Sequence, residues 1–475
     1  MEYEAIIGLE VHAELSTKTK IYCGCSTEFG GQSNTHVCPI CLGLPGALPR
    51  LNKKVVESAI KAGLALNCTI TKLGRMDRKN YFYPDCPKNY QITQDEYPLC
   101  RDGFIEIELE NGDKKKIEIE RIHIEEDAGK LLHTEAGTLV DFNRSGVPLI
   151  EIVSRPDLRS AQEAVLYLTK LKSILSSLEI SDCKMEEGSL RCDVNVSIRR
   201  CGTEKLGVRT EVKNMNSFKS LEKAISYEYT RQVEEIASGE EMHQFTRRWD
   251  ATTGVTQIMR SKEMANDYRY FPEGDLVTIN ISDSWIEEIR NTITELPYEK
   301  EARFIKEYKI PKYDAMVLTL SMEMANFFDE TAKISKDPKA SSNWLMGDVS
   351  RLMNEKAISV VDLKFSPKML SSLIKLINGG SISNNIGKKV LEEMFETGKD
   401  PEVIIEEKGL IQNNNEADIL EIVQKILVDK PNLKEDFKAG KKRALGFVVG
   451  LIMKETKGKA NPIIVNKLVG QELNK

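Results

Sequence analysis

Four segments in the N-terminal half of the chain alternate between apolar and ionisable residues, and this alternation constrains the fold more than any other feature. Successive side chains of a β-strand point to opposite faces, so a period of two places the polar groups of a segment on one face. The segments are Ala5–Leu15, Lys116–Gly129, Leu190–Arg199 and Val208–Lys213. They predict strands of an antiparallel sheet with one apolar face and one polar face.

The polar faces of these strands carry residue types that commonly bind metal ions. Hard divalent cations bind carboxylate oxygens, and a histidine can join them. Mg²⁺ in turn neutralises phosphate oxygens in phosphoryl transfer. A water-exposed sheet face without a metal is the alternative interpretation. The groups that share faces are Glu10 with His12, His123 with Glu125, Asp193 with Asn195, and Arg209 with Glu211 and Lys213.

The second segment contains a mismatch in this alternation. Ile117 and Ile119 have the same parity as His123 and Glu125, although they are apolar. The mismatch predicts either a β-bulge or a strand that is buried on both faces.

The segment Lys79–Gln94 is dense in aromatic rings, amides and lysines, and it fits neither a helical nor a strand period. Pro84 and Pro87 remove backbone donors and fix the local φ, which favours an extended loop. Such loops line sites more often than cores, and rings with amides suit a base or nucleotide. A well-packed tyrosine-rich connector is the alternative.

The chain has ten cysteines, of which four are clustered as Cys23-x-Cys25 and Cys38-x-x-Cys41. Short-spaced pairs in a cytosolic protein predict a zinc site in place of disulfides. Four thiolates leave no coordination position free for chemistry, so the predicted ion is structural. Four reduced cysteines without a metal are the alternative.

The overall composition is that of a soluble protein with several domains. A length of 475 residues exceeds one core. The longest apolar run, Ala444–Met453, is too short to span a membrane, and no secretory signal opens the chain, so we expect a cytoplasmic protein.

Charge is unevenly distributed along the chain. Lys430–Lys475 holds eleven Lys or Arg against four Asp or Glu, a net +7 in a chain of net −6, so the preceding residues carry −13. A basic end on an acidic body suggests a phosphate-rich partner, with a merely solvated helical face as the alternative.

Common nucleotide and glutaminase motifs are missing from the sequence. There is neither a G-x-x-x-x-G-K-[ST] loop nor a G-x-G-x-x-G turn after a strand, and no convincing Cys-His triad. If ATP binds, it binds on a different scaffold.

Several long runs resemble the B subunit of the bacterial aspartyl/glutamyl-tRNA(Asn/Gln) amidotransferase. They are ordered along the first part of the chain, and the helical remainder matches in layout. The runs are Ile7–His12, Cys38–Gly46, Arg78–Gln94, His123–Gly129, Asp141–Leu149, Gly188–Asn195, Glu211–Ser217 and Asp267–Pro272.

The resemblance implies an α+β fold. A cradle domain with an antiparallel, glutamine-synthetase-like sheet and the zinc loop would occupy residues 1–293. A helical domain over 294–405 and a helical tail domain over 406–475, which holds tRNA, would follow. Salt-sensitive tRNA binding is expected of the basic tail.

The resemblance also implies the reaction. ATP would phosphorylate the side-chain carboxylate of Glu or Asp misattached to tRNA(Gln) or tRNA(Asn), and ammonia would displace the phosphate. An amidase (glutaminase) partner, the A subunit, would supply the ammonia from glutamine, and a small C subunit would complete a heterotrimer. Neither a membrane nor DNA is among the expected partners. The implied cofactors are ATP, Mg²⁺ and a structural Zn²⁺.

Site residues are carried over position by position as what the resemblance implies. The magnesium ligands would be Glu10, His12, Glu125, Asp193 and Glu211, of which all but Asp193, together with Lys79, form the catalytic set. Groups that hold the aminoacyl end, the nucleotide or its phosphates would be Tyr81, Tyr83, Gln91, Lys213, Asn214 and Asn216. The zinc ligands would be Cys23, Cys25, Cys38 and Cys41.

Two other functions compete with this interpretation. A free-standing ATP-dependent carboxylate–amine ligase would explain the acidic strands but not the basic helical end. A zinc-containing tRNA-binding scaffold would explain the cysteines and the tail but not the repeated acid–histidine faces.

Overall fold

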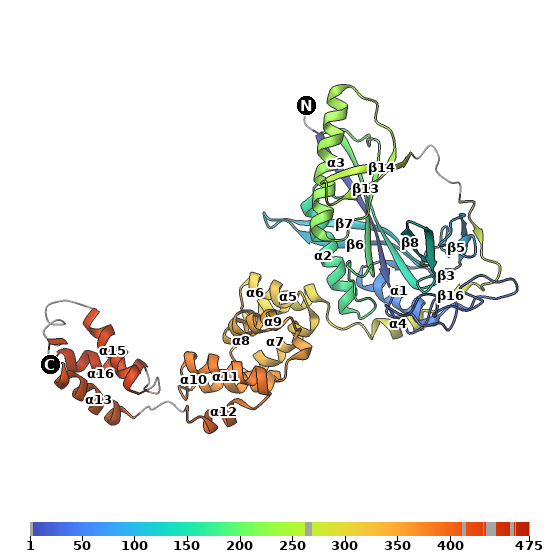
Figure 1. Cartoon of the computed structure of the whole chain (residues 1–475). Helices are drawn as coiled ribbons and strands as arrows, with labels where there is room; N and C mark the ends of the chain where they lie inside the picture. Colours follow the sequence, from blue (N-terminus) through green and yellow to red (C-terminus); the bar gives the residue numbers. More distant parts are fainter. Residues whose placement is uncertain are drawn as a thin grey trace. The chain divides into compact units, whose positions relative to one another are not determined.

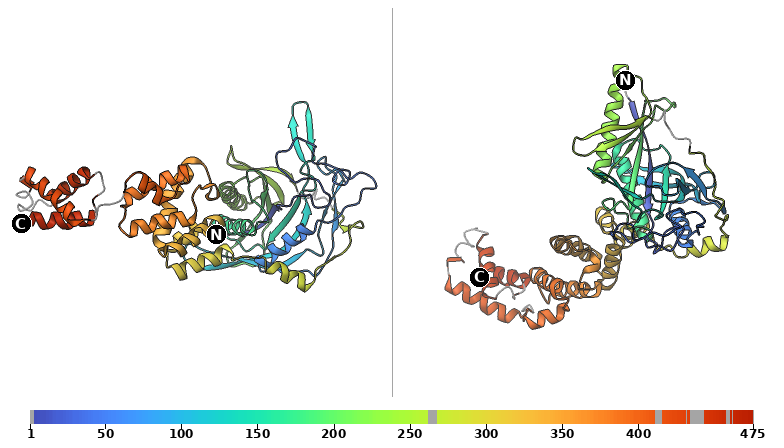
Figure 2. Two further views of the ribbon diagram at one scale, coloured as in Figure 1. Left: turned by 90° about the horizontal axis from the view of Figure 1, so that it is seen from below. Right: turned by 45° about the vertical axis from the view of Figure 1, so that its right-hand side comes forward.

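The computed structural model describes residues 3–261, 268–410, 415–430, 432–433, 443–456, 460 and 462–474. The chain divides into two compact units, Met1–Leu296 and Pro297–Lys475. The first contains strands and helices, whereas the regular elements described in the second are helices (Figures 1 and 2). The predicted α+β class is confirmed. The predicted domain limits stay predictions, as does the likeness to glutamine synthetase.

The elements of the first unit are as follows. Its strands are β1 (Tyr3–Glu14), β2 (Thr69–Ile70), β3 (Leu73–Gly74), β4 (Asp77–Asn80), β5 (Tyr90–Thr93), β6 (Cys100–Glu108), β7 (Lys114–Glu126), β8 (Lys130–Thr134), β9 (Gly137–Asp141), β10 (Pro148–Ser154), β11 (Leu190–Arg200), β12 (Thr210–Lys213), β13 (Phe245–Asp250), β14 (Val255–Ser261), β15 (Phe271–Pro272) and β16 (Ile279–Asn280). Its helices are α1 (Lys53–Ala65), α2 (Ala161–Ser177), α3 (Phe218–Ser238) and α4 (Asp283–Arg290).

Nine strands form one sheet in the order β14-β13-β12-β11-β1-β10-β7-β6-β2. Each neighbouring pair is antiparallel except β12 and β13, which are parallel. Small sheets join β15, β4 and β5, then β16 and β3, and finally β8 and β9. Hence β4, which carries Lys79, lies outside the large sheet.

Helices cover one face of the large sheet, because the apolar half of each alternating strand needs a cover. Ile7, Leu9 and Val11 of β1 are buried. Helix α3 packs on β11 beside α2, and α1 packs on β6 and β7 (Figure 1). The other face therefore carries the ionisable groups.

A β-bulge in β7 resolves the mismatch seen in the sequence. Val153 of β10 pairs with Arg121, but Ser154 pairs with Ile119, so Glu120 is an extra residue in β7. The bulge shifts the parity of the strand, and Ile119 and Ile122 on its two sides are both fully buried. This confirms the predicted bulge and explains how His123 can lie on the polar face.

The second unit is built of short helices around two apolar clusters. One cluster contains Phe304 and Phe328, whose ring centroids lie 4.8 Å apart, and the other contains Ile419 and Val465. The elements are α5 (Pro297–Tyr308), α6 (Lys312–Leu318), α7 (Met322–Ser335), α8 (Pro338–Trp344), the π-helix η2 (Leu345–Val349), α9 (Ser350–Lys356), the 3₁₀-helix η3 (Val360–Asp362), α10 (Pro367–Asn378), α11 (Asn384–Thr397), α12 (Pro401–Glu407), α13 (Glu416–Asp429), α15 (Arg443–Glu455) and α16 (Pro462–Asn474).

Most of the cationic residues of the predicted basic end lie outside the described residues. Seven of its eleven Lys and Arg fall there, and so does Asp267 of the resembling run Asp267–Pro272. Within the described part of the chain, no helix combines the length and apolar character needed to cross a bilayer.

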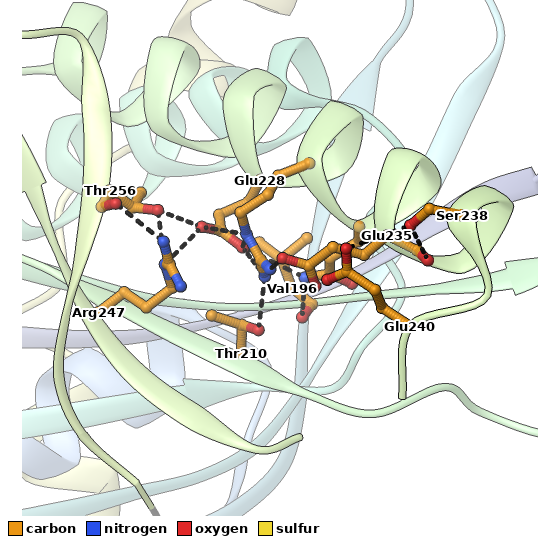
Figure 3. Close-up of polar contacts among 10 residues, drawn as sticks. Val196, Thr210, Glu228, Glu235, Ser238, Glu240, Arg247 and Thr256 are labelled. Atoms are coloured by element: carbon orange, nitrogen blue, oxygen red, sulfur yellow. Dashed lines mark hydrogen bonds and ion pairs between the residues drawn. The ribbon is translucent and has the colours of Figure 1, made fainter. Parts of the chain in front are cut away.

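A buried charge network ties α3 to the edge of the sheet (Figure 3). Glu228 of α3 is fully buried and pairs with Arg231 Nη2 at 2.7 Å and with Arg247 Nε of β13 at 3.2 Å. The hydroxyl of Thr256 on β14 also donates to Glu228, and Arg247 Nε donates to that hydroxyl at 2.7 Å. The Glu228 carboxylate thus pairs with two arginines and holds β13 and β14 against α3.

We expect Glu228→Gln to destabilise this edge of the sheet by about 3 kcal/mol, because it leaves the buried Arg247 guanidinium without its carboxylate partner. Glu235→Gln is the matched control, since Glu235 also pairs with Arg231 but is 30% exposed, and it should cost less than about 1 kcal/mol. Amide hydrogen exchange of β13 and β14 measures the effect. Equal protection in both variants would show that Glu228 does not brace the edge.

Candidate functional site

The candidate site is a row of ionisable side chains across five neighbouring strands of the polar face. Glu10 of β1 lies opposite Asp193 of β11, and His12 lies opposite Glu151 of β10. Glu151 in turn lies opposite His123 of β7. Directly opposed residues of an antiparallel pair point to the same face, so the register brings these groups together.

The row forms the floor of a cavity of about 550 Å³ and contains two triads of ligand types. In each triad the candidate ligand atoms lie within 4.8 Å of one another. We call His12, Glu125 and Glu151 the histidine triad, and Glu10, Asp193 and Glu211 the acidic triad. The structure therefore divides the predicted magnesium ligands into two sets.

In the histidine triad, the imidazole of His12 lies close to two carboxylates, and a second imidazole contacts one of them. His12 Nε2 lies 3.5 Å from Glu125 Oε1 and 3.4 Å from Glu151 Oε2. His123 Nε2, which is not part of the triad, lies 3.2 Å from the same Glu151 oxygen. Glu125 and His123 are almost fully buried.

Buried charges shift the proton affinities of this group in opposite directions. Burial alone would lower the pKa of His123, but the charge of Glu151 and hydrogen bonds to Glu125 and Glu151 raise it to about 9. Burial alone would raise the pKa of Glu151, but the charge of His123 and hydrogen bonds from both histidines hold it well below its usual value. A metal-binding imidazole must be neutral, so binding of a cation at His12 would compete with protonation of that ring.

The acidic triad is oriented by neighbouring donors. Asn195 Nδ2 donates to Glu10 Oε1 at 2.8 Å, and the buried Thr246 hydroxyl donates to Glu211 Oε2 at 2.7 Å. Lys213 Nζ donates to Asp193 and lies 3.2 Å from Glu211 Oε1. Burial raises the pKa of Glu10, and the neighbouring carboxylates, chiefly Glu151, raise it further. Such clustered carboxylates are suited to a divalent cation.

Cationic and aromatic side chains form the walls of the cavity. Lys79 Nζ lies 4.8 Å from the ring centroid of Tyr268. Burial alone would lower the pKa of Lys79, but the charge of Glu125 and other nearby groups raises it. The cavity therefore offers positive charge above an acidic floor. Further lining residues include Thr93, Arg121, Arg209, Gln244 and Tyr270.

Five other predicted site residues do not line this cavity. Tyr81 and Gln91 lie by a small separate hollow beside Glu126, whose carbonyl accepts from Gln91 Nε2 at 2.7 Å. Tyr83 is 54% exposed. Asn214 has a φ of +72° and donates to the carbonyl of Trp249 at 3.1 Å, and Asn216 is exposed. Their assigned roles stay predictions.

The four clustered cysteines come together as the zinc prediction requires. Their sulfur atoms lie within 4.8 Å of one another, and no disulfide joins them. The Sγ atoms of Cys38 and Cys41 are 3.9 Å apart. Zn–S bonds of about 2.3 Å in a tetrahedron place sulfurs about 3.8 Å apart. The residues present therefore fit a zinc ion.

The sequence analysis did not identify Glu151 as a candidate metal ligand. The signal was a lone carboxylate inside the apolar run Pro148–Ser154, which is unusual for a strand with so few polar residues. It also missed Thr246, whose contact with Glu211 depends on the parallel pairing of β12 with β13.

A helix-covered sheet with an acidic cavity, and a loop over residues 23–41 that carries the four clustered cysteines (the cysteine loop), lie in a chain that joins a GatB/GatE catalytic domain to a GatB domain. The model of the GatB/GatE catalytic domain matches residues 5–287, and that of the GatB domain matches residues 326–473. The chain therefore belongs to the GatB family.

Curated relatives match over the full length of the chain. The B subunits of the aspartyl/glutamyl-tRNA(Asn/Gln) amidotransferase from two Clostridium botulinum strains (Langeland and 657) are 74% identical over 475 residues, all of each chain. The corresponding B subunit of Clostridium tetani is 71% identical over the same length, again all of both chains.

We expect each triad to bind one divalent cation. Titration of the metal-free chain with Mn²⁺, followed by electron paramagnetic resonance, measures the number and affinity of the bound ions. Glu151→Gln should weaken the site at the histidine triad by about tenfold or more, because it removes one of three ligands. Glu118→Gln is the control, since Glu118 lies on β7 but is 56% exposed. A Glu151→Gln titration that matches the wild-type curve would contradict the assignment.

Proposed function

We propose that this chain is the part of a tRNA-dependent amidotransferase that activates and amidates Glu on tRNA(Gln), Asp on tRNA(Asn), or both. The observation that carries the proposal is the pair of triads beneath Lys79 and Lys213, in a chain that belongs to the GatB family. Relatives named for this activity match from end to end.

The proposed chemistry has two steps. An oxygen of the substrate carboxylate attacks the γ-phosphorus of ATP, which gives an acyl phosphate and ADP. Ammonia then attacks the carbonyl carbon, the bond to the phosphate-bearing oxygen breaks, and phosphate leaves with that oxygen. Phosphorylation is needed because an oxide is a poor leaving group, whereas phosphate is a good one.

The two triads suit the first step. His12, Glu125 and Glu151 would hold one Mg²⁺, and Glu10, Asp193 and Glu211 would hold another. Bound cations supply charge neutralisation for the phosphate oxygens.

The protein groups around the triads orient the reactants. The ammonium groups of Lys79 and Lys213 would face the phosphates from the wall of the cavity. Tyr268 and Tyr270 offer ring faces at the same cavity for the nucleotide or the terminal adenosine.

The remaining partners follow from the same family. Ammonia would come from glutamine that a separate amidase chain hydrolyses, and a small third chain would complete a heterotrimer. The basic C-terminal end, at +7, would contact the tRNA backbone. The cysteine loop would hold a structural Zn²⁺.

The test uses the chain in complex with its amidase and small partners, with glutamine, ATP, Mg²⁺ and Glu-tRNA(Gln). Glu125→Gln should lower amidation by about 100-fold, since a lost cation contact costs several kcal/mol in the transition state. Binding of tRNA should stay unchanged, and Glu118→Gln should retain full activity.

Each competing function predicts a different outcome. Undiminished amidation by Glu125→Gln would refute the metal role of this residue. Full ATP turnover without tRNA would favour a free-standing ligase. Bound tRNA with no ADP formed by the wild-type complex would favour the scaffold.

A further inference from the structure

Lys20 is a buried lysine whose ammonium group lies against the cysteine loop. Its side chain is fully buried. Nζ donates to the carbonyls of His36 at 2.7 Å and Phe142 at 3.3 Å, and it lies 3.7 Å from Cys41 Sγ. A buried ammonium without an opposite charge costs several kcal/mol, so a lysine in this position needs an anion.

The cysteines supply that anion. In the described part of the chain, Lys20 forms no ion pair with a carboxylate, and its side-chain partners there are two carbonyls and one sulfur. Of these, only the sulfur can carry a full negative charge. Four thiolates around Zn²⁺ carry a net charge of −2, which is itself costly to bury without an opposite charge.

We propose that Lys20 is the counter-charge of the zinc–thiolate centre and determines how firmly the loop holds its metal. This inference rests on the proposed zinc site. An N–H⁺···S⁻ contact halves the net charge of the centre and stabilises the Cys41 thiolate that binds the ion.

Lys20 is placed to join the two halves of the cysteine loop. Its backbone N–H donates to the carbonyl of Cys25 at 3.0 Å, while its side chain reaches Cys41. The same residue therefore contacts one cysteine of each pair. The Phe142 carbonyl adds a contact to the segment that follows β9.

Gly146 packs directly against this arrangement. It adopts a φ of +83°, and a Cβ there would lie 3.5 Å from both Lys20 Cδ and Cys41 Cβ. The lysine stem thus packs between the glycine and the loop, and a methionine of similar length can fill the same space without the charge.

The test compares Lys20→Met with Lys18→Met in the full-length chain, since Lys18 is exposed two residues away. Zinc content by mass spectrometry and zinc release to a chromophoric chelator are the readouts. Lys20→Met should weaken zinc binding by about tenfold or more, and Lys18→Met should match the wild type. Thermal unfolding in saturating zinc tests whether each variant folds.

Lys20→Gln separates the effect of charge from that of hydrogen bonding. It also replaces Lys20→Met as the test variant if Lys20→Met does not fold. Gln can still donate to a carbonyl but has no charge, so it should also lose zinc faster than the wild type. Zinc release at the wild-type rate from a folded Lys20 variant would overturn the inference while leaving the zinc site standing. A wild-type chain that binds no zinc would instead overturn the proposed zinc site itself.

Discussion

The alternation of apolar and ionisable side chains along β1, β7, β11 and β12 is the constraint on which the rest of the structure depends. Burial of the apolar half beneath α1, α2 and α3 fixes which face each strand presents. Once that face is fixed, the ionisable side chains of each strand must lie on the opposite face of the sheet. A register slip of one residue would move Glu10 to the helix-covered face and Leu9 to the cavity.

This constraint explains why the sheet can concentrate charge that would be costly elsewhere. The apolar face supplies the burial that stabilises the unit, and the polar face collects two triads of acids and imidazoles. Donors on neighbouring strands, such as Asn195 and Thr246, then satisfy individual carboxylates. On the helix side the arrangement is reversed, because Glu228 pairs with two arginines there.

Much of the fold was predictable because period-two patterns and helix caps are local properties. Glu10 and His12 share a face as their spacing requires, and the bulge at Glu120 follows from the parity change before His123. Ser160, a typical N-cap residue type, precedes α2 and accepts from the backbone N–H of Glu163. The gathering of the four cysteines was predictable from their spacing.

The rest of the site depends on long-range pairing, which a local pattern does not specify. Glu151 lies beside His12 only because β10 pairs with β1 and β7 on its two sides. The residues Pro148–Ser154 alone do not indicate which strands will be their neighbours. Thr246 reaches Glu211 through the single parallel pairing of the sheet. Tyr83 and Asn214 show the converse limit, since their residue types suit a site but their positions lie outside the cavity.

The measurement that tests the central claim most directly follows the oxygen atoms of the substrate. Glu-tRNA(Gln) labelled with ¹⁸O in its side-chain carboxylate is supplied to the assembled complex with ATP, Mg²⁺ and glutamine. If the carboxylate is activated by phosphorylation, one ¹⁸O appears in inorganic phosphate for each amide formed. Amide formed with unlabelled phosphate would contradict the account, because ammonia would then have displaced something other than a phosphorylated oxygen.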